Sequence, residues 1–115
     1  MKDQSCLFCK ITEGVEPSVK VWENDKFLCI KNKYPVAPVH LLVIPKDHKD
    51  KKEVASSNSG VFWGKIMEAV FAVVSEQGLD KTGYKLVNNG AGYNHFSHEH
   101  IHILGGTKTE PAGQT

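Results

Sequence analysis

Three histidines alternate with other residues in the segment HEHIHIL, residues 98–104, and this alternation constrains the fold more than any other feature. Side chains that point the same way at every second residue are typical of a β-strand, so we expect residues 98–104 to form one. The imidazoles of His98, His100 and His102 then share one face of that strand. Such a row can hold a metal ion or support a nucleophile, and the alternative is an exposed strip without function.

The rest of the chain predicts an α+β fold with a five-stranded, mostly antiparallel sheet. Apolar residues recur at three- and four-residue spacing over 60–77, which indicates one long helix on one face of the sheet. Ser5, as N-cap, and Gly14 delimit a short N-terminal helix over 5–13. The lysine-rich segment 46–58 is interpreted as a loop with room for one helical turn, and the lysine cluster over 46–52 as solvated. Strands are expected over residues 19–22, 27–30, 40–44, 84–87 and 98–104.

The length of 115 residues leaves room for one domain, with a core over residues 5–106 and a loose tail over 107–115. The chain shows neither a run of about 20 apolar residues nor a signal-like N-terminus, which predicts a cytoplasmic protein without a membrane span. The net charge is +1 and all fourteen basic residues are lysines, so broad capture of nucleic acid is not expected. Without arginine, a phosphate must be held by backbone N–H groups, Asn, His or Lys.

The cysteines suggest a metal site. Cys6 and Cys9 have the spacing of half a zinc site, and His48 is a candidate for a further ligand. Two partly buried thiols without a metal are the alternative, and a redox pair is disfavoured because no strand precedes the motif. Cys29 lies in the apolar run FLCI and is expected to pack as a small hydrophobic side chain.

The loop before the histidine strand, NNGAGYNH over residues 88–95, has two glycines within three residues. Glycines let a backbone approach an anion closely, and successive N–H groups can then surround it. An ordinary turn is the alternative for such a loop. Beside three aligned histidines in a chain without arginine, the loop predicts a phosphate site.

Three segments resemble one known family: CLFCKITEGVEPS, APVHLLVIPKDH and HEHIHILGG. Together they resemble the histidine triad (HIT) family over residues 6–106. The closing Leu104-Gly105-Gly106 is similar to the Hint branch, the histidine triad nucleotide-binding proteins, rather than to the diadenosine-polyphosphate hydrolases. The resemblance implies a HIT-like fold, a homodimer with one sheet continuous across both subunits, and binding of purine nucleoside monophosphates.

The resemblance also implies a reaction, the hydrolysis of adenosine 5′-phosphoramidates. His100 would attack the α-phosphorus and form a nucleotidyl-histidine, which water then hydrolyses. The implied roles of the other residues are contact with the phosphate and leaving group for His102, a structural role for His98, phosphate binding for Asn88, and stacking on the base for Phe8 and Ile30. Some bacterial members of the family bind a structural zinc ion, which implies a Cys2His2 site in this chain made of Cys6, Cys9, His48 and His98.

The sequence departs from the family pattern at positions that bear on substrate choice. Asn32 stands where the family usually has an acidic residue for the ribose hydroxyls, so that contact lacks charge assistance. Tyr93, Asn94 and His95 replace the usual Gly-Gln-Ser, so we expect Asn94 and His95 at the nucleotide, with His95 as a general acid or an obstruction. Glu99 occupies an apolar position of the motif, where it is either half exposed or paired with a partner such as a lysine.

Three functional interpretations stay open on the sequence alone. The first is a phosphoramidase or nucleotidyl hydrolase that uses a covalent histidine. The second is a nucleotide-binding or scaffolding protein with little turnover, which the altered loop over residues 93–95 favours. The third is a zinc-stabilised protein in which the histidine triad is mainly structural.

Overall fold

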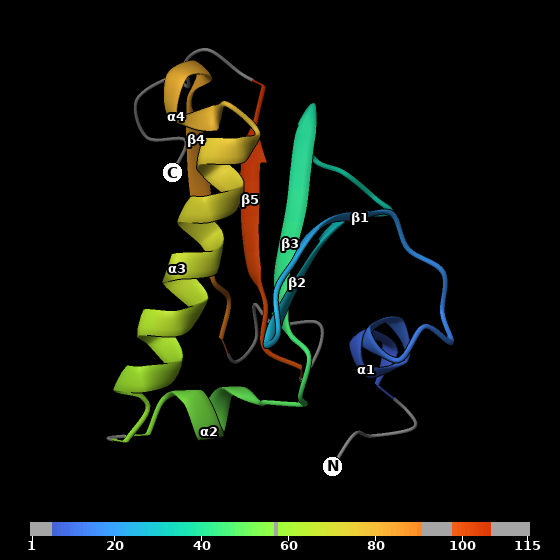
Figure 1. Ribbon diagram of the computed structural model, residues 1–115, viewed down its shortest axis with the longest axis vertical. Helices are drawn as coiled ribbons and strands as arrows, with labels where there is room; N and C mark the ends of the chain where they lie inside the picture. The colour runs from blue at the N-terminus through green and yellow to red at the C-terminus, as the bar shows by residue number, and fades with distance from the viewer. Residues whose placement is uncertain (1–5, 57, 91–97, 107–115) are drawn as a thin grey trace.

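The computed structural model describes residues 6–56, 58–90 and 98–106 of the chain, so the predicted tail lies outside the described residues. Five strands form one sheet, and a long helix lies against one of its faces (Figure 1). In chain order the elements are α1 (Leu7–Thr12), β1 (Lys20–Glu23), β2 (Phe27–Lys31), β3 (Val39–Pro45), α2 (Lys51–Val54), α3 (Gly60–Glu76), α4 (Leu79–Thr82), β4 (Tyr84–Val87) and β5 (Ile101–Gly105).

The sheet has the order β1-β2-β3-β5-β4, and every neighbouring pair is antiparallel. The predicted α+β fold with a five-stranded antiparallel sheet is therefore confirmed. β3 lies in the middle, and its residues 40–45 are all buried, as expected for a strand that is apolar almost throughout. The register places Leu42 of β3 opposite His102 of β5, which determines the side chains that meet near the histidines.

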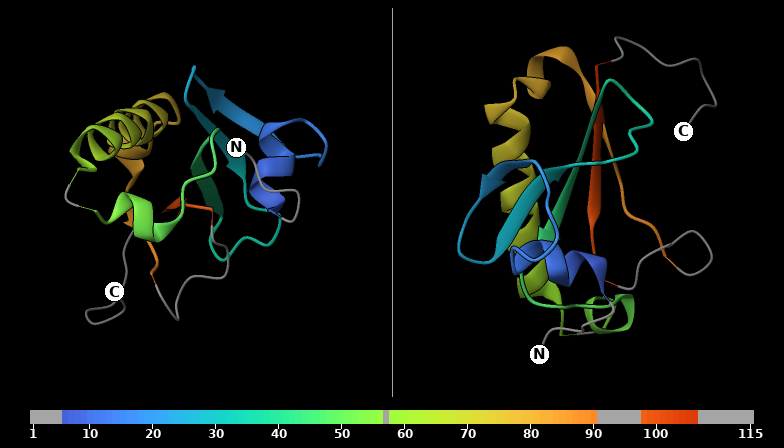
Figure 2. Two further views of the ribbon diagram at one scale, coloured as in Figure 1. Left: turned by 90° about the horizontal axis from the view of Figure 1, so that it is seen from below. Right: turned by 90° about the vertical axis from the view of Figure 1, so that its right-hand side faces the viewer.

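Each face of the sheet has its own apolar cluster. α3 covers one face, where its buried residues pack with Leu41 of β3 and Ile103 of β5. α1 lies against the other face, where Phe8 packs with Leu42 and Ile44. Figure 2 shows these two helices on opposite sides of the sheet. Because side chains alternate along a strand, residues next to Leu41 and Ile103 in sequence point toward the face that carries α1.

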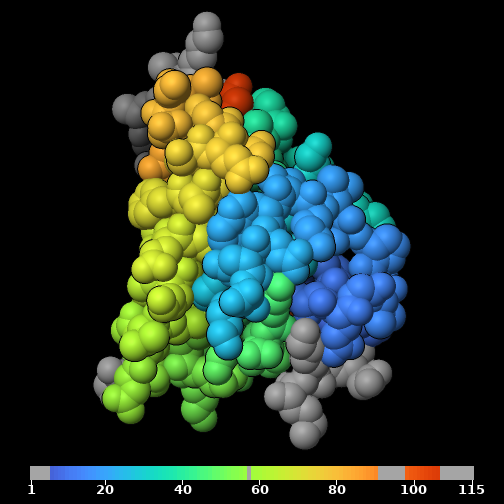
Figure 3. All heavy atoms as spheres, in the orientation of Figure 1, coloured from blue at the N-terminus to red at the C-terminus, as the bar shows by residue number. Residues whose placement is uncertain are grey.

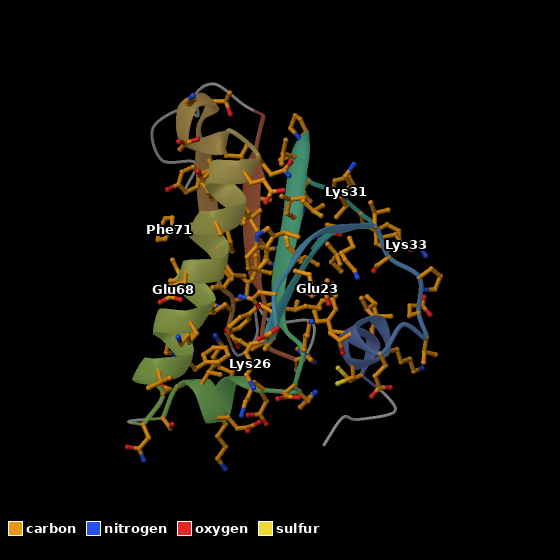
Figure 4. The ribbon with its side chains drawn as sticks, in the orientation of Figure 1. Glu23, Lys26, Lys31, Lys33, Glu68 and Phe71 are labelled. Carbon is orange, nitrogen blue, oxygen red and sulfur yellow. The ribbon has the colours of Figure 1, made fainter. Side chains whose placement is uncertain are left out.

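The outer surface is formed by the hairpin and the helices. The β1–β2 hairpin lies between α3 and α1 in the space-filling view (Figure 3). Glu68 and Phe71 lie on the side of α3 that is turned away from the sheet, and 49% of Phe71 is exposed (Figure 4). Among the described residues, none of the helices has both the length and the apolar character that crossing a bilayer requires.

The prediction that β5 begins at residue 98 is wrong, because the strand begins at Ile101. The N–H group of Glu99 donates to the main-chain carbonyl of Lys49 at 2.6 Å instead of joining the sheet. The row of imidazoles is therefore divided. His102 lies on the strand, whereas His98 lies in the irregular segment before it.

The helical boundaries also differ from the prediction. The N-cap of α1 is Cys6, whose Sγ accepts a hydrogen bond from the N–H of Cys9 at 3.3 Å, and not Ser5, which lies outside the described residues. Of the two alternatives for the segment 46–58, the one with a helical turn is found: it contains α2, which begins with a reciprocal capping box between Asp50 and Glu53. α2 and α4 have four residues each, too few for a periodic apolar pattern to reveal them.

Gly105 and Gly106 end β5 in close contact with its neighbours. A Cβ atom at Gly105 would lie 3.0 Å from Cδ2 of Leu79 and 3.2 Å from the carbonyl oxygen of Gly83. Gly106 has φ +89°, and a Cβ there would lie 2.6 Å from Cβ of Pro38. The two glycines thus allow α4 and the segment before β3 to approach the end of the strand.

Candidate active site

Three histidines gather on the sheet face opposite α3. Because Leu41 and Ile103 point toward α3, the alternation of β3 and β5 turns His40 and His102 to the other face. The ring centroids of His40 and His102 are 5.1 Å apart, and those of His100 and His102 are 5.0 Å apart. The structure therefore brings two members of the predicted triad together with a further histidine from the neighbouring strand.

The imidazole of His100 is buried and held in one orientation, with 5% of the residue exposed. Its Nδ1 atom lies 2.9 Å from the main-chain carbonyl oxygen of His98. A carbonyl oxygen can only accept, so Nδ1 carries a proton, and in the neutral ring the lone pair is on Nε2. The Phe8 ring packs edge-on to the imidazole at a centroid distance of 5.2 Å. This tautomer is the one whose Nε2 can act as a nucleophile.

His40 fixes the tautomer of His102. The main-chain N–H of Val36 donates to Nδ1 of His40 at 3.1 Å, so the proton of the neutral His40 ring is on Nε2. That Nε2 lies 2.8 Å from Nδ1 of His102, which must accept the hydrogen bond. A neutral His102 therefore carries its own proton on Nε2.

The charge state of the two rings follows from their surroundings. Burial lowers the pKa of His40 below its ordinary value. Burial, together with the nearby His100 and His40, lowers the pKa of His102 to about 4. Both rings are therefore neutral near pH 7. His102 then offers an N–H donor at Nε2 rather than a positive charge, and the side-chain amide of Asn89 lies 3.4 Å from that atom.

Asn32, the predicted ribose contact, uses its side chain within the protein. Its Oδ1 accepts a hydrogen bond from the main-chain N–H of Tyr34 at 2.8 Å. Its Nδ2 lies 3.1 Å from Nε2 of His40. The residue is thus placed directly beside the histidine that orients His102, and its role toward a ribose stays a prediction.

Glu99 is a buried carboxylate between two histidines of the triad, with 1% of the residue exposed. Its Oε2 accepts from Nζ of Lys51 at 2.8 Å and from Nδ2 of Asn88 at 2.5 Å. Asn88 also accepts from Nζ of Lys51 at 2.6 Å and donates to the carbonyl of His100 at 3.0 Å. Of the two sequence alternatives for Glu99, the lysine partner is the one found.

Four ligand atoms lie together where α1 meets the segments before α2 and β5. The side chains of Cys6, Cys9, His48 and His98 place these atoms within 4.8 Å of one another. Nδ1 of His98 lies 3.3 Å from Sγ of Cys6 and 3.4 Å from Sγ of Cys9. Nδ1 of His48 lies 3.2 Å from Sγ of Cys9. The four residues predicted as metal ligands therefore form one cluster that could hold a metal ion.

The chemistry of this cluster fits a tetrahedral ion. With Zn–S about 2.3 Å and Zn–N about 2.0 Å, sulfur and nitrogen ligands at the tetrahedral angle would be about 3.5 Å apart, close to the separations found. Nε2 of His98 donates to the carbonyl of Pro45 at 2.7 Å, which leaves the Nδ1 lone pair facing the sulfurs. Burial, with a hydrogen bond to Cys9, raises the pKa of the Cys6 thiol to about 11, and a positive ion would stabilise its thiolate.

Of the remaining predicted site residues, two lie in the described part of the chain and two do not. Phe8 and Ile30 belong to the apolar cluster under α1, and each has 3% of its surface exposed. Their stacking on a base stays a prediction, which requires them to become accessible. Asn94 and His95 lie outside the described residues.

Two residues of the site were missed as site residues by the sequence interpretation. His40 lies in the apolar strand HLLVI, where it is the one polar residue, and that is the signal the sequence offers for it. Lys51 lies in a run of lysines that was interpreted as solvated. Their contacts join residues 62 and 48 positions apart, so the sheet register and the placement of α2 are needed to find them.

Residues 5–114 match the protein family described as "Scavenger mRNA decapping enzyme C-term binding". Protein HitA of Neisseria gonorrhoeae is 37% identical over 102 residues, which cover 88% of this chain and 95% of HitA. The chain belongs to the histidine triad superfamily. Within it, the likeness to the adenylylsulfatase HINT3 of Arabidopsis thaliana supports the Hint branch, with 38% identity over 86% of this chain and 51% of HINT3.

Solved structures agree with this assignment. A histidine triad protein from Clostridium difficile has a TM-score of 0.87 and 36% identity, covering 96% of this chain and 98% of its own. A HIT family hydrolase from Legionella pneumophila has a TM-score of 0.83 and 35% identity, covering 95% and 100%. A zinc-bound histidine triad family protein from Mycobacterium smegmatis has a TM-score of 0.70 and 26% identity, covering 96% and 78%. This histidine triad protein therefore has the fold of HIT family hydrolases.

Proposed function

We propose that this histidine triad protein is a purine nucleoside phosphoramidase, a nucleotidyl hydrolase that forms a covalent bond between Nε2 of His100 and the α-phosphorus. The observation that carries the proposal is the hydrogen bond from Nδ1 of His100 to the carbonyl of His98, because it places the lone pair on Nε2. A neutral imidazole oriented in this way is a good nucleophile toward phosphorus, and its bond to phosphorus is labile enough for water to finish the reaction.

In the first step, Nε2 of His100 bonds to phosphorus as the P–N bond of the adenosine 5′-phosphoramidate breaks. The N–H at Nε2 of His102 donates to a phosphoryl oxygen as charge develops there. The leaving nitrogen takes a proton and departs as ammonia, and we assign that proton to the imidazolium of His95. In the second step, water bonds to phosphorus, His95 accepts its proton, and AMP leaves as the N–P bond breaks.

The nucleotide is proposed to lie along the face that carries the three histidines. Its phosphate lies at His100 and His102, close to Asn88 and the loop that holds Asn94. Its ribose lies toward Asn32 and its base toward Phe8 and Ile30. The positions of the histidines and of Asn32 around one cluster support this arrangement.

A second substrate class deserves a direct comparison, because HINT3 is named an adenylylsulfatase. Sulfate is a stable anion and can leave without taking up a proton, whereas an amine nitrogen cannot. Adenylyl sulfate and adenosine 5′-phosphoramidate therefore separate the attack by His100 from the proposed proton donation by His95. A His95→Ala variant is expected to lose far more activity on the phosphoramidate than on adenylyl sulfate.

The central test is a single-turnover reaction with adenosine 5′-phosphoramidate, followed by mass spectrometry of the intact protein. The wild type is expected to show a transient AMP adduct and to release AMP, and His100→Ala is expected to show neither while it still binds AMP. AMP binding without an adduct or turnover on either substrate would instead favour a nucleotide-binding or scaffolding protein. A folded protein without affinity for AMP would favour a mainly structural triad.

We further propose that the ion held by Cys6, Cys9, His48 and His98 is zinc with a structural role. Four protein ligands leave no open coordination position, so the ion would tie α1 to the start of the triad rather than take part in hydrolysis. When bound, it would supply positive charge that keeps the two cysteines as thiolates. The proposed cytoplasmic location agrees with three cysteines that are all free thiols, which suits a reducing compartment.

We propose a homodimer formed through the edge strand β4 and the outer face of α3. β4 ends the sheet, so one side of its backbone can pair with a second copy. Phe71 on α3 and Tyr84 on β4 are exposed by 49% and 40%. Light scattering after size-exclusion chromatography should show a dimer for the wild type and a monomer for Phe71→Lys. Asp25→Lys, in the exposed turn between β1 and β2, is the control and should stay a dimer. A monomeric wild type would contradict the proposal.

A further inference from the structure

We propose that Lys51 and Glu99 are positioning residues that hold the nucleophile His100 in place through Asn88. The inference rests on the proposed function in that it takes His100 as the nucleophile. The three side chains form one hydrogen-bonded network next to the segment 98–100, in which Glu99 is buried and Lys51 is partly exposed. In this chain the network occupies a place where the family motif has an apolar residue.

The chemistry of the network determines how the Asn88 amide is turned. The ammonium of Lys51 can only donate, so the Asn88 atom that lies 2.6 Å from it must be the oxygen. The ionised carboxylate of Glu99 can only accept, so the atom facing it must be the amide nitrogen. With both sides fixed, the same nitrogen faces the carbonyl of His100 at 3.0 Å and donates to it.

The nucleophile needs such support because its segment lies outside the sheet. Pairing between β3 and β5 extends only to the pair Val43 and Ile101 in the described residues. The main chain of residues 98–100 is instead held by the Glu99 N–H on the carbonyl of Lys49 and by Asn88 on the carbonyl of His100. Loss of the network would free the carbonyl of His100, and the ring would no longer keep its hydrogen bond to His98.

The position of Lys51 is fixed by the contacts of α2. It is the first residue of α2, which begins at the capping box of Asp50 and Glu53. The other end of α2 is attached to α3, because the indole N–H of Trp63 donates to the carbonyl of Val54 at 2.6 Å. Nζ of Lys51 also lies 5.5 Å from the centre of the Trp63 ring, a cation–π distance.

Comparing single variants of Lys51 and Glu99 with a double variant separates an effect on the position of His100 from an effect on the stability of the fold. Replacing Lys51 leaves the buried carboxylate of Glu99 without its cation, and replacing Glu99 leaves the partly exposed ammonium of Lys51 without its anion, so each single change destabilises. Replacing both with apolar side chains is often nearly neutral. Glu99→Gln and Lys51→Met are therefore expected to lower the midpoint of thermal unfolding. The double variant Glu99→Leu/Lys51→Met should recover most of that loss, and in it Asn88 has lost both groups that orient its amide.

The kinetic test compares these variants with the wild type on adenosine 5′-phosphoramidate, well below their unfolding temperatures and with zinc supplied. The double variant should keep a kcat reduced by about tenfold or more, because a small misplacement of a nucleophile has effects of that order. Its KM should change by less than about threefold, since neither of the two replaced residues, Lys51 and Glu99, is placed at the nucleotide. Recovery of kcat together with stability would overturn the proposal, because a merely structural pair predicts that result.

A second readout does not depend on turnover. In protein with 15N-labelled histidine, the ring nitrogens of wild-type His100 should report a proton on Nδ1, and the double variant should show a mixture of tautomers. If the wild type turns over neither proposed substrate, the proposed function fails, but this spectrum still decides the role of the network. Identical His100 ring signals in the wild type and the double variant would overturn it. Exposed residues provide matched controls, Lys52→Met and Glu68→Gln, and both should leave spectrum and kcat unchanged.

Discussion

Nε2 of His40 lies 2.8 Å from Nδ1 of His102, across the interface between β3 and β5. The main-chain N–H of Val36 donates to Nδ1, the other ring nitrogen of His40. If both rings are neutral, His40 and His102 must therefore each carry their proton on Nε2. The proton offered to a substrate at Nε2 of His102 is thus specified by the backbone amide of Val36, in the segment that leads into β3.

This relay predicts the behaviour of His40 variants. His40→Leu removes the donor that faces His102, so His102 can adopt the wrong tautomer, and kcat should fall by about tenfold to a hundredfold with little change in KM. His40→Gln carries an amide that can still donate and should retain more activity. Steady-state kinetics on adenosine 5′-phosphoramidate measure both variants. Wild-type kcat in the leucine variant would show that the relay is not used.

The lowered pKa of His102 predicts how stability depends on pH. Its ordinary pKa is 6.5 and its folded pKa is about 4, so between these values the unfolded chain binds a proton that the folded chain does not. The free energy of unfolding should therefore fall as pH falls from 6.5 toward 4, and burial of His40 acts in the same direction. Urea unfolding between pH 7.5 and 5 with excess zinc should show a weaker dependence in His102→Gln than in the wild type.

Glu23 provides the control for that measurement. Lys20 and Lys46 lower its pKa from 4.5 to about 2, so its contribution is present above pH 4.5 and is lost as pH falls toward 2. A Glu23→Gln variant should therefore keep the wild-type pH dependence above pH 5. A different pH dependence of the free energy of unfolding in Glu23→Gln above pH 5 would mean that the histidines do not dominate this dependence.

The metal cluster predicts a definite stoichiometry. The wild type should contain one zinc ion per chain by elemental analysis, and a strong chelator should lower its unfolding temperature, because an ion that binds only the folded state stabilises it. Cys9→Ser should contain almost none, since Sγ of Cys9 faces both His48 and His98. Cys29→Ala, from the core under α3, should keep the full equivalent. Full zinc content in Cys9→Ser would contradict the assigned ligand set.

Two glycine-to-alanine substitutions should have opposite effects. Gly106 has φ +89° and no space for a Cβ beside Pro38, so Gly106→Ala should destabilise by roughly 1–3 kcal/mol. Gly64 lies inside α3, where a Cβ would meet nothing within 4 Å, so Gly64→Ala should stabilise by roughly 0.5–1 kcal/mol. Urea unfolding of the two variants measures both values, and effects of the same sign would contradict the assignment.

The parts of the fold that the sequence predicted are those set by local patterns. The three- and four-residue spacing of apolar residues predicted α3 almost to its ends, and the apolar run over residues 40–44 predicted the strand that the structure places in the middle of the sheet. The start of β5 could not be predicted in this way. The alternation of histidines continues to residue 98, but hydrogen bonds to Lys49 and Asn88 hold the segment before Ile101 away from the ladder.

The site was predictable where the residues are neighbours in sequence or belong to a known motif. The four residues of the metal cluster could be named from the sequence because the family resemblance implies that ligand set. The pairing of His40 with His102 and of Lys51 with Glu99 depends on sheet register and on where a four-residue helix begins. Neither has a local signal, so only the folded chain could reveal them.

The contact between Trp63 and Lys51 gives the molecule a fluorescent reporter of its own. The indole is fixed by its N–H on Val54, with the lysine ammonium 5.5 Å from the ring. Indole emission responds to nearby charge, so its wavelength should follow the presence of the ammonium that pairs with Glu99. Trp22 is the other tryptophan of the chain, and replacing it with Phe would leave Trp63 as the single indole. The emission wavelength of Trp63, on α3, would then report whether the Lys51–Glu99 pair that positions His100 is intact, although His100 serves the opposite face of the sheet.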